Sequence, residues 1–366
     1  MISTQKRATR LMRPTRARNL GTLGLIGVVA AGGALFTAST MLAPRAEAGD
    51  LPEPAQESTH TRTEPASSQA DNRTDDRATP KRQDRFWVNP DTQAATWVAE
   101  NPDDERASVI GDRIAGVAQG TWFTEYNPAE VAAQVDEVVS AADADGASPI
   151  LVVYNMPNRD CGGPSGGGAP DHSSYRGWVD QVAAGLADRP ATVVLEPDVL
   201  ALMTDCMDDA QQAQVQDSMA YAAQTLGAGP ARVYYDSSHS AWLEPGEMAQ
   251  RLTAAGIAEH GDGVATNTSN YRLTEDEVAY ATAILDSVGD PDLGAVIDTS
   301  RNGNGPSPDD EWCDPQGRAI GAPSTSDTGH DRVDAFLWVK LPGEADGCAA
   351  EAGQFDPDLA YALATN

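Results

Sequence analysis

Short apolar segments recur along the chain from residue 149 to residue 339, and their starts lie 31 to 42 residues apart. Polar and glycine-rich residues follow each of them. Uninterrupted apolar segments of this length, rich in Val and Ile, are typical of strands buried on both faces of a parallel sheet. The predicted strands are 149–154, 191–195, 231–235, 263–265, 294–297 and 335–339.

Helical patterns occupy the intervals between these segments. From Tyr175 to Leu186 apolar side chains repeat with the spacing of an amphipathic helix, for which Ser173 or Ser174 is the expected N-cap. Thr274 and Glu277 have the spacing of a capping box at the start of another helix. Repeated strand–helix units with right-handed crossovers form either a barrel or a doubly wound sheet, which makes this an α/β protein.

The N-terminal part of the chain differs from the rest in composition. Basic residues, an apolar segment at 20–42 and a small-x-small cleavage pattern at 46–48 predict that residues 1–48 are a signal peptide. An uncleaved membrane anchor is the alternative. Residues 49–84 have one large apolar side chain, which predicts a disordered linker. We therefore expect a secreted, extracellular protein whose folded domain spans 85–366.

The charge of the chain argues against several classes of partner. The net charge is −30, and residues 49–366 carry 18 Lys and Arg against 54 Asp and Glu. Such a surface repels phosphate backbones and anionic lipids, so we expect neither nucleic acid nor, after signal removal, a membrane as partner. We expect a monomer.

Carboxylates, amides or a lysine, side chains that can bind or catalyse, follow all six predicted strands. In α/β folds the active site lies at the carboxyl ends of the strands, so these groups predict one site there. The segments concerned are 155–160, 196–198, 236–240, 266–270, 298–302 and 340–346.

Four cysteines allow three disulfide pairings. Cys161 and Cys206 follow consecutive predicted strands, as do Cys313 and Cys348, so we favour these two pairs as staples between adjacent loops. A zinc site is the less favoured alternative, because the chain has no Cys-x-x-Cys spacing and only five His.

The carboxylates indicate acid–base chemistry. Asp198 follows a buried apolar segment and a proline, an environment that would keep its proton and make it a general acid. The alternative is a surface Asp that caps the next helix. His239 suits a catalytic base or a partner for a sugar hydroxyl. Carboxylates together with loop tryptophans point to glycoside hydrolysis.

Several strings in this order resemble glycoside hydrolase family 6, the inverting cellulases, and within it the bacterial endoglucanases. They are Gly-Thr-Trp at 120–122, Asn-Arg-Asp-Cys at 158–161, Glu-Pro-Asp at 196–198, Asp-Ser-Ser-His at 236–239, Asp-Thr-Ser-Arg-Asn at 298–302, Glu-Trp-Cys-Asp at 311–314 and Lys-Leu-Pro-Gly-Glu-Ala-Asp at 340–346.

The resemblance implies a distorted (β/α) barrel of about seven parallel strands, with an active-site groove at the carboxyl ends of the strands. It further implies hydrolysis of internal β-1,4-glucosidic bonds of cellulose with inversion, without a cofactor or metal. The alternatives are an exo-acting cellobiohydrolase of the same family and a non-catalytic glucan-binding protein. The compact loops of this chain favour internal cleavage.

The family's functional residues carry over by motif. Asp198 matches the general acid, Asp236 a supporting carboxylate, and Tyr154 the residue that crowds the distorted sugar. Asp160 matches the residue that raises the pKa of the acid and handles the proton of the attacking water. Asp346 matches a proposed general base, and which of these two acts as the base stays open. Substrate-contacting positions match Trp122, His239, Trp242, Asn270, Trp312, Lys340 and Glu344.

One position departs from the family pattern. A serine that helps to hold the attacking water often stands six residues after the position of Asp160, where this chain has Gly166. The neighbouring Ser165 or a backbone group is the expected substitute.

The acidic excess yields a first prediction. Like charges that repel one another are screened by salt, so the free energy of unfolding should increase between low and molar NaCl. Thermal unfolding of the secreted chain followed by circular dichroism measures this. A melting temperature that stays constant over that range would indicate an ordinary acidic protein instead.

Overall fold

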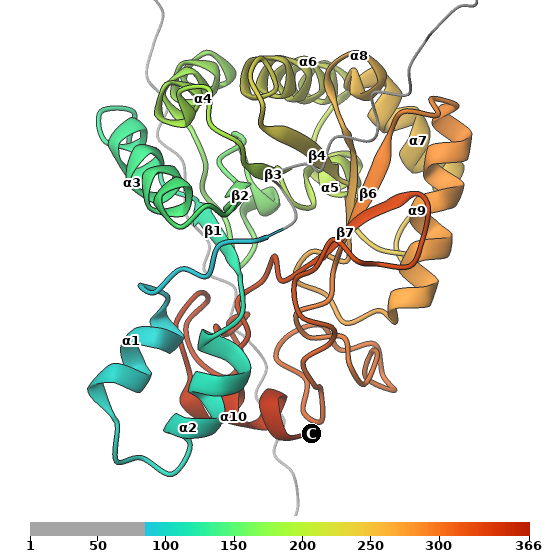
Figure 1. Ribbon diagram of the computed structural model, residues 1–366. Helices are drawn as coiled ribbons and strands as arrows, with labels where there is room; N and C mark the ends of the chain where they lie inside the picture. The colour runs from blue at the N-terminus through green and yellow to red at the C-terminus, as the bar shows by residue number, and fades with distance from the viewer. Residues whose placement is uncertain (1–84) are drawn as a thin grey trace, which may run out of the picture. The chain divides into compact units, whose positions relative to one another are not determined.

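Seven parallel strands form a sheet within residues 85–366, the part of the chain that the computed structural model describes (Figure 1). Their order in the sheet is their order in the sequence, because each strand pairs with the next along the chain. The strands are β1 Gly120–Phe123, β2 Ile150–Val153, β3 Thr192–Leu195, β4 Arg232–Asp236, β5 Gly263–Thr266, β6 Gly294–Asp298 and β7 Val333–Leu337.

The predicted barrel with seven parallel strands is confirmed, and six of its strands coincide with predicted segments. The sequence pattern missed β1, which has only two large apolar residues. Its Gly120 is required by close packing, since a Cβ atom there would lie 2.5 Å from the carbonyl oxygen of Val339. The Gly120 amide donates to the carbonyl oxygen of Trp338 at 2.8 Å, which connects β1 to the segment after β7.

Helices surround the sheet. Figure 1 shows α3, α4, α6 and α9 along its outer side, whereas α1, α2 and α10 gather near the C-terminus. The helices are α1 Gln93–Glu100, α2 Ala107–Ile110, α3 Val131–Ala144, α4 His172–Leu186, α5 Val199–Cys206, α6 Asp209–Leu226, α7 Pro245–Ala254, α8 Ile257–His260, α9 Thr274–Val288 and α10 Pro357–Thr365. A π-helical turn, Gly111–Ala115, continues α2, and a 3₁₀ turn, Asp160–Gly162, follows β2.

Both faces of the sheet are buried, as the uninterrupted apolar segments predicted. Leu151 and Val193 belong to the core between the sheet and the outer helices. Val152, Val194 and Tyr234 belong to a second core that fills the inside of the barrel. Because side chains alternate between the faces of a strand, β1 to β6 each contribute to both cores, whereas the outer side chains of β7, Val333 and Phe336, pack with Ile297 in a separate small cluster.

Two predicted helix starts differ from the structure. The N-cap of α4 is Asp171, whose side chain accepts the amide of Ser174, so neither Ser173 nor Ser174 caps this helix. The N-cap of α9 is Leu273, and its side chain makes no capping hydrogen bond. The predicted capping box is wrong because Glu277 is drawn inward, where it accepts the amide of Ser240 at 2.9 Å.

The predicted signal peptide and linker, residues 1–48 and 49–84, lie outside the described residues. Within residues 85–366 we find no helix with the length and apolarity needed to cross a membrane.

The favoured cysteine pairing is confirmed. Disulfides join Cys161 to Cys206 and Cys313 to Cys348, each with 5.8 Å between the Cα atoms. The first connects the loop after β2 to the end of α5, and the second connects the loops that follow β6 and β7.

These crosslinks give a second prediction. Replacing both Cys161 and Cys206 by Ser should lower the free energy of unfolding by about 3–4 kcal/mol, because the crosslink restricts the unfolded chain. Denaturation in urea under non-reducing conditions measures the loss. The Cys313→Ser/Cys348→Ser variant is the matched control and should lose nearly as much, since the two loops span 45 and 35 residues. Equal stability of the wild type with and without reductant would contradict this expectation.

Candidate active site

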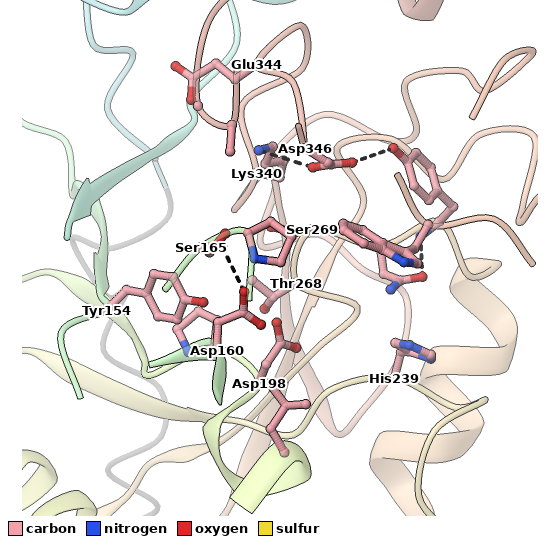
Figure 2. A pocket seen from close by; sticks show the side chains of 18 of the residues that line it. Tyr154, Asp160, Ser165, Asp198, His239, Thr268, Ser269, Lys340, Glu344 and Asp346 are labelled. Atoms are coloured by element: carbon pink, nitrogen blue, oxygen red, sulfur yellow. Dashed lines mark hydrogen bonds and ion pairs between the residues drawn. The ribbon is translucent and has the colours of Figure 1, made fainter. Parts of the chain in front are cut away.

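A cavity of about 830 Å³ lies at the carboxyl ends of the strands. Eleven of the twelve side chains predicted for catalysis or substrate contact line it together (Figure 2). They are Trp122, Tyr154, Asp160, Asp198, His239, Trp242, Asn270, Trp312, Lys340, Glu344 and Asp346. The twelfth, Asp236, is buried at the end of β4 and contacts the site from below.

Asp198 is a half-buried carboxyl with negative neighbours. It occupies the N-cap position of α5 with φ 65°, yet its side chain makes no capping hydrogen bond, so the helix-cap alternative is wrong. Burial raises the pKa of Asp198 well above its usual range, and the charges of Asp236 and Asp160 raise it further. A buried carboxyl with two anions near it keeps its proton to a higher pH than an exposed aspartic acid does.

Asp236 shares this environment but differs in hydrogen bonding. Its Oδ1 accepts the amides of Asp198 and Ser238, both at 2.9 Å. Burial raises the pKa of Asp236 as well, whereas these amide donors favour its ionised form. Of the two carboxyls, Asp236 is therefore the one favoured in its ionised form, and it accepts the backbone amide of Asp198.

Asp160 lies in the glycine-rich loop that follows β2. Its Oδ2 accepts the amide of Ser165 at 2.8 Å. A Cβ atom at Gly163 would lie 2.6 Å from the same oxygen, so only glycine allows this close approach. At Gly166 a Cβ atom would meet the carbonyl oxygen of Gly163 at 3.0 Å. The loop thus has little room for the family's serine at 166, and the backbone of Ser165 contacts Asp160 instead.

Arg159 supports this loop from inside. Its guanidinium donates to the carbonyl oxygens of Thr124 at 2.7 Å, Tyr154 at 2.6 Å and Ser165 at 2.8 Å. It also lies 4.6 Å from the centre of the Tyr154 ring. One cation therefore joins the ends of β1 and β2 to the segment that carries Asp160.

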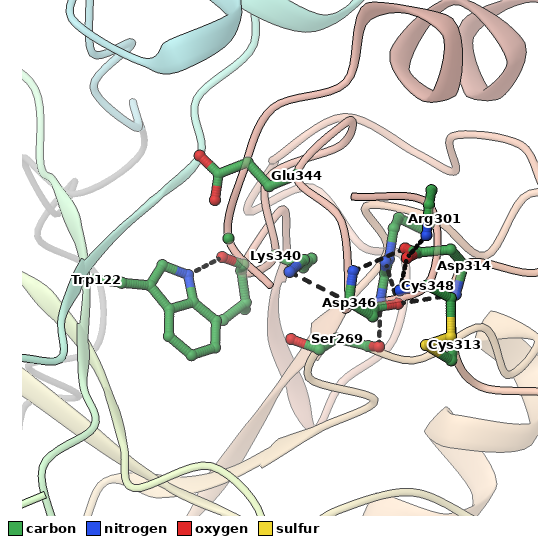
Figure 3. Close-up of polar contacts among 12 residues, drawn as sticks. Trp122, Ser269, Arg301, Cys313, Asp314, Lys340, Glu344, Asp346 and Cys348 are labelled. Atoms are coloured by element: carbon green, nitrogen blue, oxygen red, sulfur yellow. Dashed lines mark hydrogen bonds and ion pairs between the residues drawn. A yellow bond between two sulfur atoms is a disulfide. The ribbon is translucent and has the colours of Figure 1, made fainter. Parts of the chain in front are cut away.

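Asp346 lies on the other side of the cavity, among cations (Figures 2 and 3). Its Oδ2 accepts Arg301 at 2.8 Å and the hydroxyl of Tyr271 at 3.1 Å, and Lys340 Nζ lies 3.3 Å from its Oδ1. Burial alone would raise the pKa of Asp346, but Arg301 and Lys340 hold it below its ordinary value. This carboxylate stays ionised.

Two further carboxylates fix the loops on this side. Asp298, at the end of β6, accepts the amides of Ser269 and Lys340, both at 3.0 Å. Asp314 accepts the amides of Asp346 at 2.8 Å and Cys348 at 2.9 Å, next to the second disulfide (Figure 3). Lys340 and Asp346 are therefore positioned through their own backbone as well as through their side chains.

Tryptophans form the walls of the cavity. Trp122 donates its indole N–H to the carbonyl oxygen of Val339 at 2.8 Å (Figure 3). Its ring meets that of Tyr154 edge to face, with 5.6 Å between the ring centres. Trp242 and Trp312 are more open, with exposed fractions of 36% and 54%. Large aromatic faces left open to solvent beside a cavity suit contact with a flat ligand.

Among the other residues predicted to contact substrate, His239 and Asn270 offer uncharged polar groups. Burial and Arg272 lower the pKa of His239 to about 4, so its imidazole is neutral at neutral pH. Burial raises the pKa of Glu344, whose Oε1 accepts Gln93 at 2.6 Å. Asn270 accepts the amide of Tyr271 at 3.0 Å. Neutral groups of this kind are suited to hydrogen bonds with hydroxyls.

Sequence reasoning gave no role to Arg159, Arg301 or Asp314. A signal was present for Arg301, since it follows a predicted strand in a chain with few cations. Its partner Asp346 lies 45 residues further on, a contact that only the folded chain reveals.

Comparison with known proteins agrees with this architecture. The sequence model of glycosyl hydrolases family 6 matches residues 81–366. Endoglucanase A from Thermobispora bispora is 56% identical over 283 residues, which cover 77% of this chain and 62% of that protein. Endoglucanase 1 from Streptomyces sp. (strain KSM-9) is 52% identical over 271 residues, 73% of this chain and 75% of that protein.

The fold is likewise that of a solved relative. The endoglucanase Cel6 from Mycobacterium tuberculosis, solved in complex with methyl-cellobiosyl-4-deoxy-4-thio-β-D-cellobioside, aligns with a TM-score of 0.71 and 40% identity. The alignment covers 76% of this chain and 96% of that one. On the match of the family model and of these relatives, the chain belongs to glycosyl hydrolases family 6.

Proposed function

We propose that this protein is an endo-β-1,4-glucanase that cleaves internal bonds of cellulose with inversion. The observation that carries the proposal is that Asp160, Asp198 and Asp346 line one cavity walled by tryptophans, with carboxylates near Asp198 and two cations paired with Asp346. Two carboxyl groups with opposite protonation states are what glycoside hydrolysis requires. The names of its relatives at 52–56% identity support the endo mode.

Asp198 is the proposed general acid. It gives its proton to the glycosidic oxygen as the bond to the anomeric carbon breaks, and a water attacks that carbon from the opposite face. Asp236 stays ionised beneath it and keeps the pKa of Asp198 high. Tyr154 is proposed to crowd the sugar at the cleavage point, and Arg159 holds its ring.

In this proposal Asp160, and not Asp346, takes up the proton of the attacking water. Asp346 is paired with Arg301 and Lys340, and a carboxylate with a lowered pKa is a weak base. Its charge instead stabilises the positive charge that develops on the sugar ring. Asp160 forms no ion pair among residues 85–366, and because its Oδ2 accepts the Ser165 amide, its Oδ1 is left for water.

Substrate contact is assigned to the remaining groups of the cavity. Trp122, Trp242 and Trp312 offer faces for stacking against pyranose rings, and the oligosaccharide complex of the Mycobacterium tuberculosis enzyme supports a glucan as ligand. His239, Asn270, Lys340 and Glu344 are proposed to bind sugar hydroxyls. We also propose a secreted monomer, and its secretion is supported by the two disulfides and the N-terminal signal pattern.

The assignment of the acid gives a third prediction. Asp198→Ala should lower kcat on carboxymethyl cellulose by between about 10²- and 10⁴-fold, because protonation of the leaving oxygen is lost. The fold should persist, since the side chain accepts no hydrogen bond within residues 85–366. Viscometry measures the rate, and circular dichroism checks the fold. Unchanged turnover by the folded variant would refute the role of Asp198.

The same viscometric assay with the wild type separates endo from exo action. Internal cleavage shortens the polymer early, so viscosity should fall rapidly while little reducing sugar appears. Release of cellobiose at constant viscosity would identify a cellobiohydrolase. Binding of the polymer with neither change would identify a glucan-binding protein.

The coupled carboxyls give a fourth prediction, on pH dependence. Asp236→Asn removes an anion that raises the pKa of Asp198 but keeps an oxygen that can accept both amides. Asp198 should then lose its proton at a lower pH, and the alkaline limb of the kcat/KM profile should move to lower pH. Profiles of both proteins on carboxymethyl cellulose test this. A limb that stays in place would show that Asp198 does not set it.

A further inference from the structure

Glu196 is a buried carboxyl of the Glu-Pro-Asp segment that no catalytic step above uses. We propose that it is a positioning residue, which sets the place of the Asp160 loop relative to the acid Asp198. The inference rests on the proposed function for its kinetic consequences. Its structural content, a carboxylate that anchors a loop root, stands on contacts alone.

The first contact is with the root of the Asp160 loop. Glu196 Oε1 accepts the amide of Asn155 at 3.0 Å, and Oε2 accepts the amides of Asn155 at 3.1 Å and Met156 at 2.9 Å. Asn155 and Met156 begin the loop just after Tyr154. The far end of the loop returns to the same place, since Ala169 donates its amide to the carbonyl oxygen of Asn155 at 2.9 Å. Glu196 therefore anchors the start of the loop directly, and the far end of the loop is held through Asn155.

Glu196 is also connected to the acid through the chain, because it precedes Asp198 by only two residues. Pro197 between them has a fixed φ and limits how the two can move apart. Glu196 itself has φ 50°, a region that suits Asn or Asp better than Glu. A strained backbone conformation at a residue with a fully buried side chain indicates that the side chain is needed there.

The protonation state of Glu196 bears on the choice of variant. Burial raises its pKa to about 7, against the opposing effect of the two amides. Oε2 alone accepts from both Asn155 and Met156, so the neutral acid retains both contacts. Glutamine has the shape of that neutral acid, with its carbonyl oxygen in place of Oε2. It should therefore keep the two bonds made to Oε2 and lose only the bond from Asn155 to Oε1, whereas alanine loses all three.

The experiment compares Glu196→Ala and Glu196→Gln on carboxymethyl cellulose. Misplacing the Asp160 loop should lower kcat of Glu196→Ala by about 10²-fold, because displacement of a reacting group by about 1 Å has that effect. Its KM should stay within about threefold of wild type, since the tryptophan walls are untouched. Glu196→Gln should restore kcat to within about threefold of wild type.

Glu277→Ala is the matched control. Glu277 is equally buried and accepts one backbone amide, that of Ser240, but this amide belongs to the loop that carries His239 and Trp242. Its loss should raise KM and largely spare kcat, the opposite of the result for Glu196→Ala. If the two alanine variants change kcat and KM alike, the effect is general destabilisation and the proposal is overturned.

Other outcomes are equally decisive. A folded Glu196→Ala enzyme with wild-type kcat, or a glutamine variant as slow as the alanine variant, overturns the proposal. If Glu196→Ala does not fold, Glu196→Asp replaces it. Aspartate keeps the carboxyl group, but its shorter side chain moves the oxygens away from the two amides, so its kcat must be lower than that of Glu196→Gln.

Amide hydrogen exchange separates this inference from the proposed function. The amides of Asn155 and Met156 should exchange faster in Glu196→Ala than in Glu196→Gln, whether or not the wild type hydrolyses cellulose. Equal exchange refutes the anchor, whereas an inactive wild type with the expected exchange refutes the proposed function alone.

Discussion

The geometry of the site depends on buried carboxylates that accept backbone amides from neighbouring loops. Glu196 after β3, Asp236 at the end of β4 and Asp298 at the end of β6 each bind an amide of the loop that follows the preceding strand. Loops at the end of a parallel sheet have amides without ladder partners, and hydrogen bonds to charged acceptors contribute about 1.5–3 kcal/mol each. The loops are thereby fixed from below, which leaves their outer side chains free to face the cavity.

This arrangement divides the cavity into two electrostatic halves. Around Asp198 the charged neighbours are carboxylates, so the site retains a proton there. Around Asp346 the neighbours are Arg301 and Lys340, so the carboxylate stays ionised. Two aspartates thus differ in protonation at one pH because their charged neighbours differ. Those neighbours are set by the loops that the buried carboxylates bring together through hydrogen bonds to backbone amides.

Much of this could be predicted from the sequence where a property is local. Strands buried on both faces have uninterrupted apolar segments, so the sequence marks where a strand such as β3 ends, at Leu195. Because the carboxyl ends of parallel strands meet, the position of the site followed from these strand ends. The pairing of Arg301 with Asp346 and the inward turn of Glu277 could not be predicted, because each depends on a loop distant in sequence. For the same reason β1 was missed: Gly120 is required by the carbonyl of Val339, not by any local pattern.

Local preference is overruled most clearly where the chemistry lies. Asp160, Glu196 and Asp198 all have positive φ, a conformation that glycine adopts without strain and that costs other residues about 1–3 kcal/mol. Glycine at these positions would relieve the backbone but would remove the carboxyls. Glycines are instead placed beside them, as at Gly163, where a side chain would collide with Asp160. The hydrogen bonds between these carboxyl groups and backbone amides therefore offset the strain. Loss of one such bond should change the backbone conformation locally while the barrel stays folded.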